Sequence, residues 1–445
     1  MNAELLDEAF SSISETYENP TQDIYYFAKM DKFLVKDSRG IFVAYKRDYL
    51  QYEFSDKGFS KKISRSLIHQ IQSDNVVDAY LDIAGHPVGL VRNSENRILV
   101  PAEQRRIEPK KGNWPTIKKV LFNMLSKDQY EWFLGWLQVW LQAYYAYSWA
   151  PGQVLVLIGE PAAGKSLLQR LLSYIFGGKF VDPTPWVTGQ TEFNSELAGC
   201  PHLVIEDRFA DSTKKIKDSI RERSKSIAVN EYHRIRGLYK EAISINPLWR
   251  LTISCNATAE SMGVIPPIDE STKNKVSLLW CSKARMPMAT NTHIQKKRFM
   301  DRLEKEMPAL IYYLLKEFKI KDRHQCKERR MGVGAYHHPN ALKKAEDSSY
   351  YGQKMCIVID ALKAWAPENC FINHEISLPK VQDGTEWTGT PSELLQIICR
   401  IPSFRNEFKA SNSLGRILQN RVDLKTGEVT KNADRTYTIN LHSKF

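Results

Sequence analysis

Residues 154–166, VLVLIGEPAAGKS, decide the interpretation of this 445-residue chain. Residues 154–158 form an uninterrupted apolar run of the kind that makes a buried parallel strand. The next eight residues fit the P-loop pattern G-x-x-x-x-G-K-[ST]: Gly159, Glu160, Pro161, Ala162, Ala163, Gly164, Lys165 and Ser166. Residues 167–176 then have the apolar spacing of a helix, which Gly177 and Gly178 should end. A strand, this loop and a helix in direct succession predict a nucleotide-binding site.

The residue types in this loop suit a triphosphate. The glycines let the backbone turn so that successive N–H groups face one anion, and the helix that begins near Leu167 directs its positive end at the same place. Lys165 is expected to reach the β- and γ-phosphates, and the Ser166 hydroxyl to hold Mg²⁺. We therefore expect residues 159–167 to bind ATP with Mg²⁺.

Composition leaves the partner of the protein open. Lys and Arg number 63 against 51 Asp and Glu, a formal charge of +12, which favours an anionic partner such as nucleic acid. A basic surface without a ligand is the alternative. The hydrophobic content of 42% is ample for folded cores.

The cysteines and apolar stretches argue for a cytosolic protein. The seven cysteines are scattered and contain no C-x-x-C pair, which fits reduced thiols rather than a disulfide framework. The spacing of His324, Cys326, His337 and His338 matches no common zinc pattern. The N-terminus is too weakly apolar for a signal peptide. The uncharged stretch 133–159 is interrupted by polar residues, so a buried aromatic helix and not a membrane span is expected.

A second buried strand is expected at residues 202–205, and it ends in Glu206 and Asp207. Carboxylates at the C-terminal end of a parallel strand lie at the crevice where a P-loop ligand binds. One acid can hold Mg²⁺ while the other orients the attacking water, and the sequence does not separate the two roles. An acidic strand end without a role is the alternative.

A strongly basic stretch covers residues 214–240. Its second part, from residue 226, is expected to form a hairpin with its tip at Arg236-Gly237. Cations alternate there with Tyr232 and Tyr239, a pattern suited to a loop that follows a nucleic-acid backbone, whereas a solvated hairpin is the alternative. The candidate nucleic-acid ligands are Lys225, Arg234, Arg236 and Lys240.

A third buried strand, residues 249–255, ends at Asn256. This amide can hydrogen-bond both a γ-phosphate and the attacking water. Arg250, Lys273 and Lys275 are the nearest candidates for a cation that reaches the γ-phosphate on a neighbouring subunit.

The order of these motifs resembles that of superfamily 3 helicases, which are ring-forming AAA+ ATPases, and most of all the phage and plasmid primase-helicase branch related to the poxvirus helicase-primase. The segments GEPAAGKS, HLVIEDR, the basic stretch and WRLTISCN follow one another within about a hundred residues. The resemblance implies ATP and Mg²⁺ as ligands, Asn256 as a sensor, a pore loop near Arg236 and Lys240, and a homo-oligomeric, hexameric ring. Two departures are Arg208, where many relatives carry an acid, and lysines after Pro267, where many carry an arginine pair.

The expected fold is α/β with four parts. An N-terminal α+β accessory region covers residues 1–112, opening with a polar helix up to residue 20, and a P-loop ATPase with an AAA+-like parallel sheet and a helical entry covers residues 113–318. A basic linker of helix and loop spans residues 319–386. Residues 387–445 resemble a winged helix, whose Arg416, Arg421, Lys425 and Lys431 are expected to meet phosphates. A lid or an oligomer contact is the alternative for this last part.

The function predicted from the sequence is an ATP-dependent replicative DNA helicase of a phage or mobile element, working on single-stranded or forked DNA in the bacterial cytoplasm. A primase or an origin-binding replication protein is an expected partner, and a membrane is not. The alternatives are a DNA-remodelling or packaging motor that does not unwind, and an origin-binding initiator switched by nucleotide.

Overall fold

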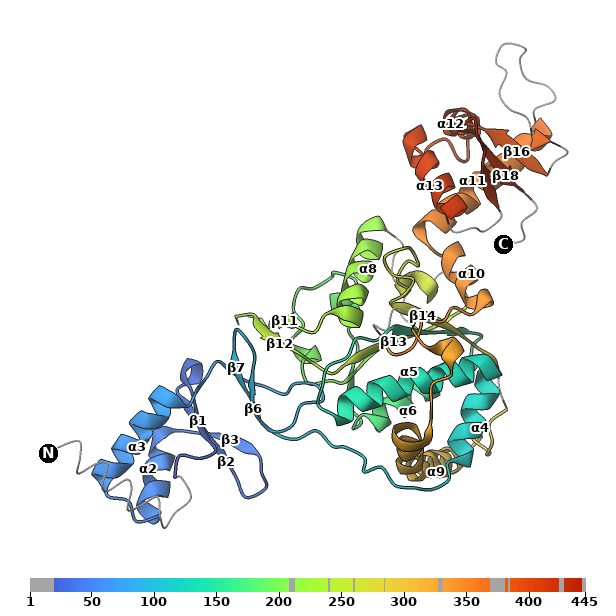
Figure 1. Ribbon diagram of the computed structural model, residues 1–445. Helices are drawn as coiled ribbons and strands as arrows, with labels where there is room; N and C mark the ends of the chain where they lie inside the picture. The colour runs from blue at the N-terminus through green and yellow to red at the C-terminus, as the bar shows by residue number, and fades with distance from the viewer. Residues whose placement is uncertain are drawn as a thin grey trace.

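The computed structural model describes residues 20–207, 213–238, 241–258, 261–283, 285–326, 331–368, 381–382, 385–423 and 428–441. The fold is mixed α/β, and its N-terminal, central and C-terminal units follow one another across the molecule in chain order (Figure 1). The helix expected before residue 20 lies outside the described residues.

The N-terminal unit is a four-stranded sheet with two helices on one face. The sheet order is β3-β2-β1-β4. Side chains alternate along β1 and β2, so that Ile24 and Phe33 face the helices while Leu34 faces the opposite side. The elements are β1 (Ile24–Phe27), β2 (Lys32–Lys36), β3 (Phe42–Tyr45), α2 (Arg47–Asp56), α3 (Lys61–Asp74) and β4 (Val76–Val77).

A small sheet of order β5-β7-β6 joins this unit to the central one. Leu99 of this sheet packs into the N-terminal core, whereas Ile98 and Val100 pack into the central core. Two strands of this sheet form an antiparallel hairpin. Its strands are β6 (Gly89–Arg92) and β7 (Arg97–Val100), and β5 is Ala79–Tyr80.

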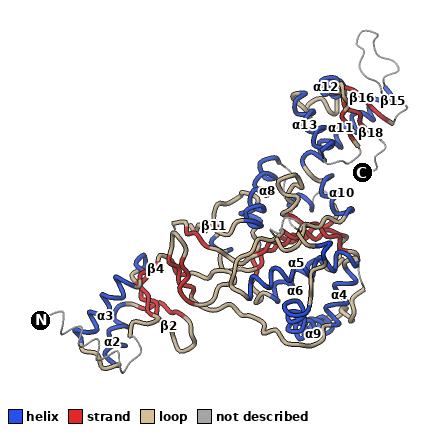
Figure 2. Tube along the Cα trace, viewed as in Figure 1, coloured by secondary structure: helices blue, strands red, loops and turns tan. Residues whose placement is uncertain are grey.

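A five-stranded sheet of order β14-β8-β13-β10-β9 forms the centre of the molecule, and every pair of neighbours in it is parallel. Apart from the short edge strand β9, these strands are buried almost throughout because helices cover both faces of the sheet. They are β8 (Val154–Gly159), β9 (Phe180–Val181), β10 (His202–Glu206), β13 (Arg250–Asn256) and β14 (Val276–Cys281). Figure 2 shows these strands gathered between two groups of helices.

Side chains of β8 alternate between the two cores that these helices form. Leu155 and Leu157 face one core, and Val154, Val156 and Ile158 face the other. The helices of the first core are α4 (Pro115–Met124), α5 (Lys127–Tyr145), α6 (Lys165–Ile175) and α9 (His293–Tyr312), which a π-helical turn (Tyr313–Glu317) extends. Those of the second are α7 (Thr184–Val187), α8 (Lys214–Val229) and α10 (Pro339–Asp347).

The uncharged stretch before the loop is a buried helix. Trp132, Trp136 and Trp140 recur at every fourth position of α5 and all lie in the first core. Among the residues that the structure describes, no helix is both long and apolar enough to cross a bilayer.

The C-terminal unit has its own core around the fully buried Trp387. Its antiparallel sheet has the order β15-β16-β18-β17. A helix precedes the first strands, two helices follow them, and a hairpin ends the unit. The elements are α11 (Tyr350–Glu368), β15 (Val381–Gln382), β16 (Glu386–Gly389), α12 (Pro391–Arg400), α13 (Ser411–Asp423), β17 (Val429–Lys431) and β18 (Tyr437–Asn440).

Residues 319–386 differ from the expected linker. Ala341 and Ala345 of α10 pack into the central core, and Met355 and Leu362 of α11 pack into the C-terminal core. Each helix has enough apolar side chains to pack into the core next to it. The boundary between the central and C-terminal units therefore falls between α10 and α11.

Candidate functional site

Three strands bring polar residues to one edge of the central sheet. Gly159 at the end of β8 pairs with Asn256 at the end of β13, and Asp207 follows the last residue of β10. Because parallel strands end at the same edge, segments about fifty residues apart in the sequence meet there. This edge is therefore the candidate site.

The loop of residues 159–166 has the backbone turn that its sequence predicted. Gly164 caps α6 with φ +87°, and Ala162 has φ +62°, so both lie in the left-handed region. The start of α6 then presents the unpaired N–H groups of its first turn to the same space. The loop can hold an anion with its backbone.

Lys165 is the best-fixed side chain of the site. Only 5% of it is exposed, and its Nζ donates to the carbonyl oxygens of Gly159 at 3.1 Å and Glu160 at 2.8 Å. The same Nζ donates to the Asn256 Oδ1 at 2.9 Å. The lysine and the asparagine, 91 positions apart, are thus one hydrogen-bonded pair.

Gly159 is required by the neighbouring strand. A Cβ at this position would lie 2.2 Å from the carbonyl oxygen of Cys281 in β14. Only glycine lets β8 and β14 pair up to their ends, where the loop begins.

A buried polar cluster fastens α6 to the sheet. The Gln169 Nε2 donates to the Thr252 Oγ1 at 3.0 Å, and His202 contacts the hydroxyls of Ser173 at 2.8 Å and Thr252 at 2.9 Å. Complete burial lowers the pKa of His202 to about 3, so the imidazole is neutral. These contacts fix the orientation of the helix whose N-terminus faces the site.

A pocket of about 590 Å³ opens above this edge. Residues 161–167 of the loop, Asp207 and Asn256 line it. It is also lined by residues that the sequence analysis missed: Arg170, Met286, Thr290, Lys296, Phe299 and Met300. Arg170 was detectable because it lies one helical turn after Ser166, whereas the residues from 286 onward belong to α9 and the segment before it and reach the pocket only through tertiary packing.

The two acids after β10 are not equivalent. Asp207 lines the pocket and has the unusual φ of +40°, while its N–H donates to the Ser254 carbonyl at 3.1 Å. Glu206 is exposed at the strand end and is not among the lining residues. A non-glycine residue with such a backbone is a recurrent feature of functional sites.

The oxygen donors at this place suit Mg²⁺. The Ser166 hydroxyl and the Asp207 carboxylate both line the pocket, and neither has a side-chain hydrogen bond among the described residues. Hydroxyl and carboxylate oxygens with room for water are the ligands that Mg²⁺ prefers. The residues present therefore fit this ion.

The cysteines beside β8 are chemically inert. Burial raises the pKa of Cys255 and of Cys281 to about 12, so both remain protonated thiols. The site has no thiolate nucleophile among these residues.

Arg250 does not lie where the sequence analysis placed it. It begins β13 at the opposite edge of the sheet, is 3% exposed, and donates to the carbonyl oxygens of Trp249 at 2.9 Å and Ala150 at 2.6 Å. A guanidinium fixed inside the sheet cannot reach another subunit. The prediction for Arg250 is wrong because the charge of a residue does not reveal its burial.

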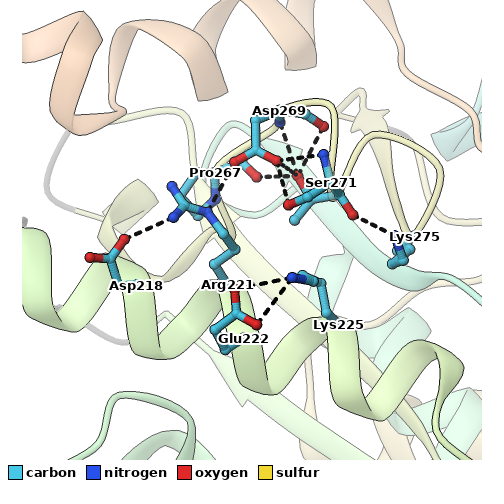
Figure 3. Close-up of polar contacts among 9 residues, drawn as sticks. Asp218, Arg221, Glu222, Lys225, Pro267, Asp269, Ser271 and Lys275 are labelled. Atoms are coloured by element: carbon cyan, nitrogen blue, oxygen red, sulfur yellow. Dashed lines mark hydrogen bonds and ion pairs between the residues drawn. The ribbon is translucent and has the colours of Figure 1, made fainter. Parts of the chain in front are cut away.

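Lys273 and Lys275 lie on the loop that precedes β14. Figure 3 shows Lys275 there, beside Ser271. The Lys275 Nζ donates to the Ser271 carbonyl within this loop, and Asp269 ties the loop to α8 through its ion pair with Arg221 at 2.9 Å. Lys273 is 54% exposed and pairs with the exposed Glu270. Of the three candidates for a cation acting on a neighbour, Lys273 is the accessible one.

The basic stretch is a helix followed by a hairpin. Residues 226–229, expected to be strand, complete α8, and the hairpin is formed by β11 (His233–Ile235) and β12 (Ile243–Ile245). Lys225 therefore lies on the helix, where it pairs with Glu222 at 3.0 Å. The apolar positions of residues 214–229 have helical spacing, which accounts for the difference.

The hairpin itself presents the expected cations. Residues 232–238 alternate, so that Arg234 and Arg236 are exposed together with Tyr232, while His233 and Ile235 are buried. The Arg236 guanidinium lies over the ring of Phe193 at 5.9 Å from its centroid. Cations with flat side chains between them thus share one face. Lys240 lies outside the described residues.

One of the cations predicted for the C-terminal unit is internal. Arg421 is 1% exposed and lies between Asp347 at 3.6 Å and Glu428 at 3.3 Å, so it cannot meet a phosphate. Arg416 is exposed, and Lys431 donates to Gln419 at 2.9 Å. Lys425 lies outside the described residues.

The histidines that were weighed as metal ligands have other contacts. Within the described residues, one group of three side chains is close enough to share an ion: Asp128, Glu131 and His324. The Arg323 guanidinium pairs with both acids, and Lys321 pairs with Glu131 at 2.7 Å. Protein cations already neutralise this group.

The comparisons with known proteins agree with the fold. Residues 157–273 match the family described as "Family of unknown function (DUF5906)". Solved apo structures of the C-terminal region of NrS-1 are similar over 94% of this chain and 95% of theirs. The structure of residues 305–718 has a sequence identity of 14% and a TM-score of 0.52. An A-form structure has a sequence identity of 15% and a TM-score of 0.51. No curated protein matches the sequence.

Proposed function

We propose that the central unit binds Mg²⁺-ATP and hydrolyses it. The observation that carries the proposal is the hydrogen bond of 2.9 Å between the Lys165 Nζ and the Asn256 Oδ1 in a pocket that Asp207 also lines. This contact joins the lysine of a P-loop to the amide expected to sense the γ-phosphate.

Each residue of the pocket has a defined part in this proposal. The backbone N–H groups of the loop and Lys165 bind the phosphates, and Ser166 and Asp207 hold the metal. Mg²⁺ neutralises the charge that develops on the transferred phosphoryl group. Asn256 orients water, and Glu206, exposed beside the pocket, is the remaining candidate for the base.

The strand order supports an AAA+ core. Numbered within the central unit, the sheet order β14-β8-β13-β10-β9 is 5-1-4-3-2, which resembles that of AAA+ ATPases. In such proteins the site is completed by a neighbouring subunit of a ring. The exposed Lys273 is our candidate for that contribution, in a hexamer of superfamily 3 type.

DNA is the proposed substrate of the motor. The exposed face of Arg234 and Arg236 has the charges and flat side chains that grip a single strand. The order of elements from α11 to β18, helix, strands, two helices and a hairpin, is that of a winged helix, which reads duplex DNA. With the likeness to an NrS-1 region, these features support an ATP-dependent helicase in the replication of a phage or mobile element, working beside a primase or an origin-binding protein.

Hydrolysis of ATP with and without single-stranded DNA, measured beside unwinding of a forked duplex, tests the proposal. Lys165→Ala should abolish both activities, whereas Lys179→Ala, which removes an exposed lysine paired with Asp82, should preserve them. Asp207→Asn should abolish hydrolysis while nucleotide binding remains. Hydrolysis without unwinding would favour a remodelling motor, and binding without turnover would favour a nucleotide switch.

A further inference from the structure

A groove of about 460 Å³ lies between α2 and α3 of the N-terminal unit, far along the chain from the loop of residues 159–166. From α2 it is lined by Asp48, Gln51, Tyr52 and Ser55. Their spacing of three and four residues places them on one face of the helix. The groove is therefore built from a continuous stripe of side chains.

The other wall supplies an aromatic ring and cations. Phe59, in the connection between the helices, lines the groove and packs edge-on against the buried Phe54, with centroids 6.1 Å apart. Lys61 and Arg65 lie one helical turn apart on α3, and both are exposed. The wall is rigid at its base and positively charged at its rim.

Within the described residues, most polar side chains of the groove have no internal partner; Ser64, which also lines it, donates to the Ser60 carbonyl at 3.0 Å. Among the described residues, Gln51, Ser55, Lys61 and Arg65 have no side-chain hydrogen bond or ion pair. The Tyr52 side chain is 79% exposed, although aromatic rings are normally found at least half buried. An exposed ring, free cations and free amide and hydroxyl groups together suit a flat, polar and anionic ligand.

We propose that this groove binds single-stranded DNA, with one base against Tyr52 and the neighbouring phosphates at Lys61 and Arg65. Stacking of bases on exposed aromatic rings beside a positive rim is the general means of binding single strands. Asp48 would repel a phosphate but can accept a hydrogen bond from the amino group of a base, so cytosine is favoured over thymine. The proposal does not depend on ATP hydrolysis by the central unit.

The test uses the full chain carrying Arg234→Ala and Arg236→Ala, so that the hairpin cannot mask the groove. Binding of fluorescein-labelled dC₁₂ is followed by anisotropy without nucleotide. Tyr52→Ala should weaken binding at least about fivefold. The matched control is Tyr49→Ala, which removes a tyrosine from the same helix that stacks on Tyr45 at 3.8 Å outside the groove; it should leave the affinity unchanged.

The cations are tested by salt dependence. Lys61→Ala with Arg65→Ala should reduce the slope of log K against log salt by about 1.4, because each phosphate contact on a single strand contributes about 0.7. Lys32→Ala, on the sheet face opposite the helices, should not change it. Three results would overturn the proposal. They are an affinity for dT₁₂ equal to that for dC₁₂, tighter binding of rC₁₂ than of dC₁₂, and displacement of dC₁₂ by polyglutamate of the same total charge.

Cross-linking locates the site independently. A dC₁₂ strand with one 5-iodouracil should, on irradiation, attach to the peptide that contains residues 47–65, in the unsubstituted chain and equally in Lys165→Ala. If Lys165→Ala loses ATPase activity and still forms this cross-link, DNA binding in the groove is independent of ATP hydrolysis by the central unit. Attachment only elsewhere in the chain would refute the groove.

Discussion

Gly159→Ala tests whether the end of β8 is held in place by its neighbour strand. The introduced Cβ would lie 2.2 Å from the carbonyl oxygen of Cys281 and 3.1 Å from its carbonyl carbon. A comfortable contact of this type is about 3.3 Å, so β14 and the loop must separate by roughly 1 Å. Both atoms belong to backbone in a close-packed sheet, so neither can rotate away.

The expected cost is that of overpacking, about 1–3 kcal/mol of unfolding free energy. The same shift moves the Gly159 carbonyl, which accepts the hydrogen bond of 3.1 Å from Lys165. ATP affinity should therefore fall about tenfold if roughly 1.4 kcal/mol of phosphate binding is lost. Thermal unfolding and titration with a fluorescent ATP analogue measure the two effects.

Gly178→Ala is the matched control. This glycine has φ +84° and nothing within 4 Å of an added Cβ, so the substitution introduces left-handed strain of about 1–2 kcal/mol without a clash. It should lower the melting temperature and leave ATP affinity unchanged. The reasoning is refuted if Gly159→Ala binds the nucleotide as tightly as the unsubstituted chain.

Three further predictions concern buried ionisable side chains. Arg250→Ala should destabilise the central sheet by about 1–3 kcal/mol, seen in urea unfolding, because two carbonyl oxygens lose their donor, with ATPase activity per folded molecule retained. The pKa of His202 falls from 6.5 to about 3 on folding, so its contribution to the free energy of unfolding is present above pH 6.5 and is lost as the pH falls, by about 1.4 kcal/mol at pH 5.5. His202→Asn should flatten the dependence of stability on pH between 7.5 and 5.5. An unchanged pH dependence in this variant contradicts the assignment. Arg421→Ala leaves Asp347 and Glu428 without their shared cation, so limited proteolysis should show a C-terminal unit loosened by about 3 kcal/mol, whereas an intact unit would mean that the arginine is dispensable.

The sequence located the candidate site well because its signals are local. The strand, the glycines and Lys165 of residues 154–166 are contiguous, and the turn that they form depends on the φ preferences of those residues alone. Asn256 was found for a related reason: an apolar run that ends in a polar residue marks the end of a buried strand. That these segments are neighbours followed from the parallel sheet rule.

Burial is the property that the sequence misjudged. Arg250 and Arg421 looked like surface cations, yet both are internal and partnered by groups from other segments. Arg250 meets Ala150, 100 positions away, and Arg421 meets Asp347 from another unit. No local pattern distinguishes such an arginine from one that meets DNA.

What the sequence by itself determined is the position of three buried strands of the central unit, β8, β10 and β13, and the backbone turn that follows β8, since apolar runs and glycine positions act over a few residues. Tertiary structure alone decided that Asp207 and not Glu206 faces the pocket, that Lys296 joins it, and that Tyr52 stands beside Lys61. These relations depend on strand register and on the packing of helices distant in the chain. Strand register and helix packing are determined by close packing among residues from many segments, so no short stretch of sequence specifies them.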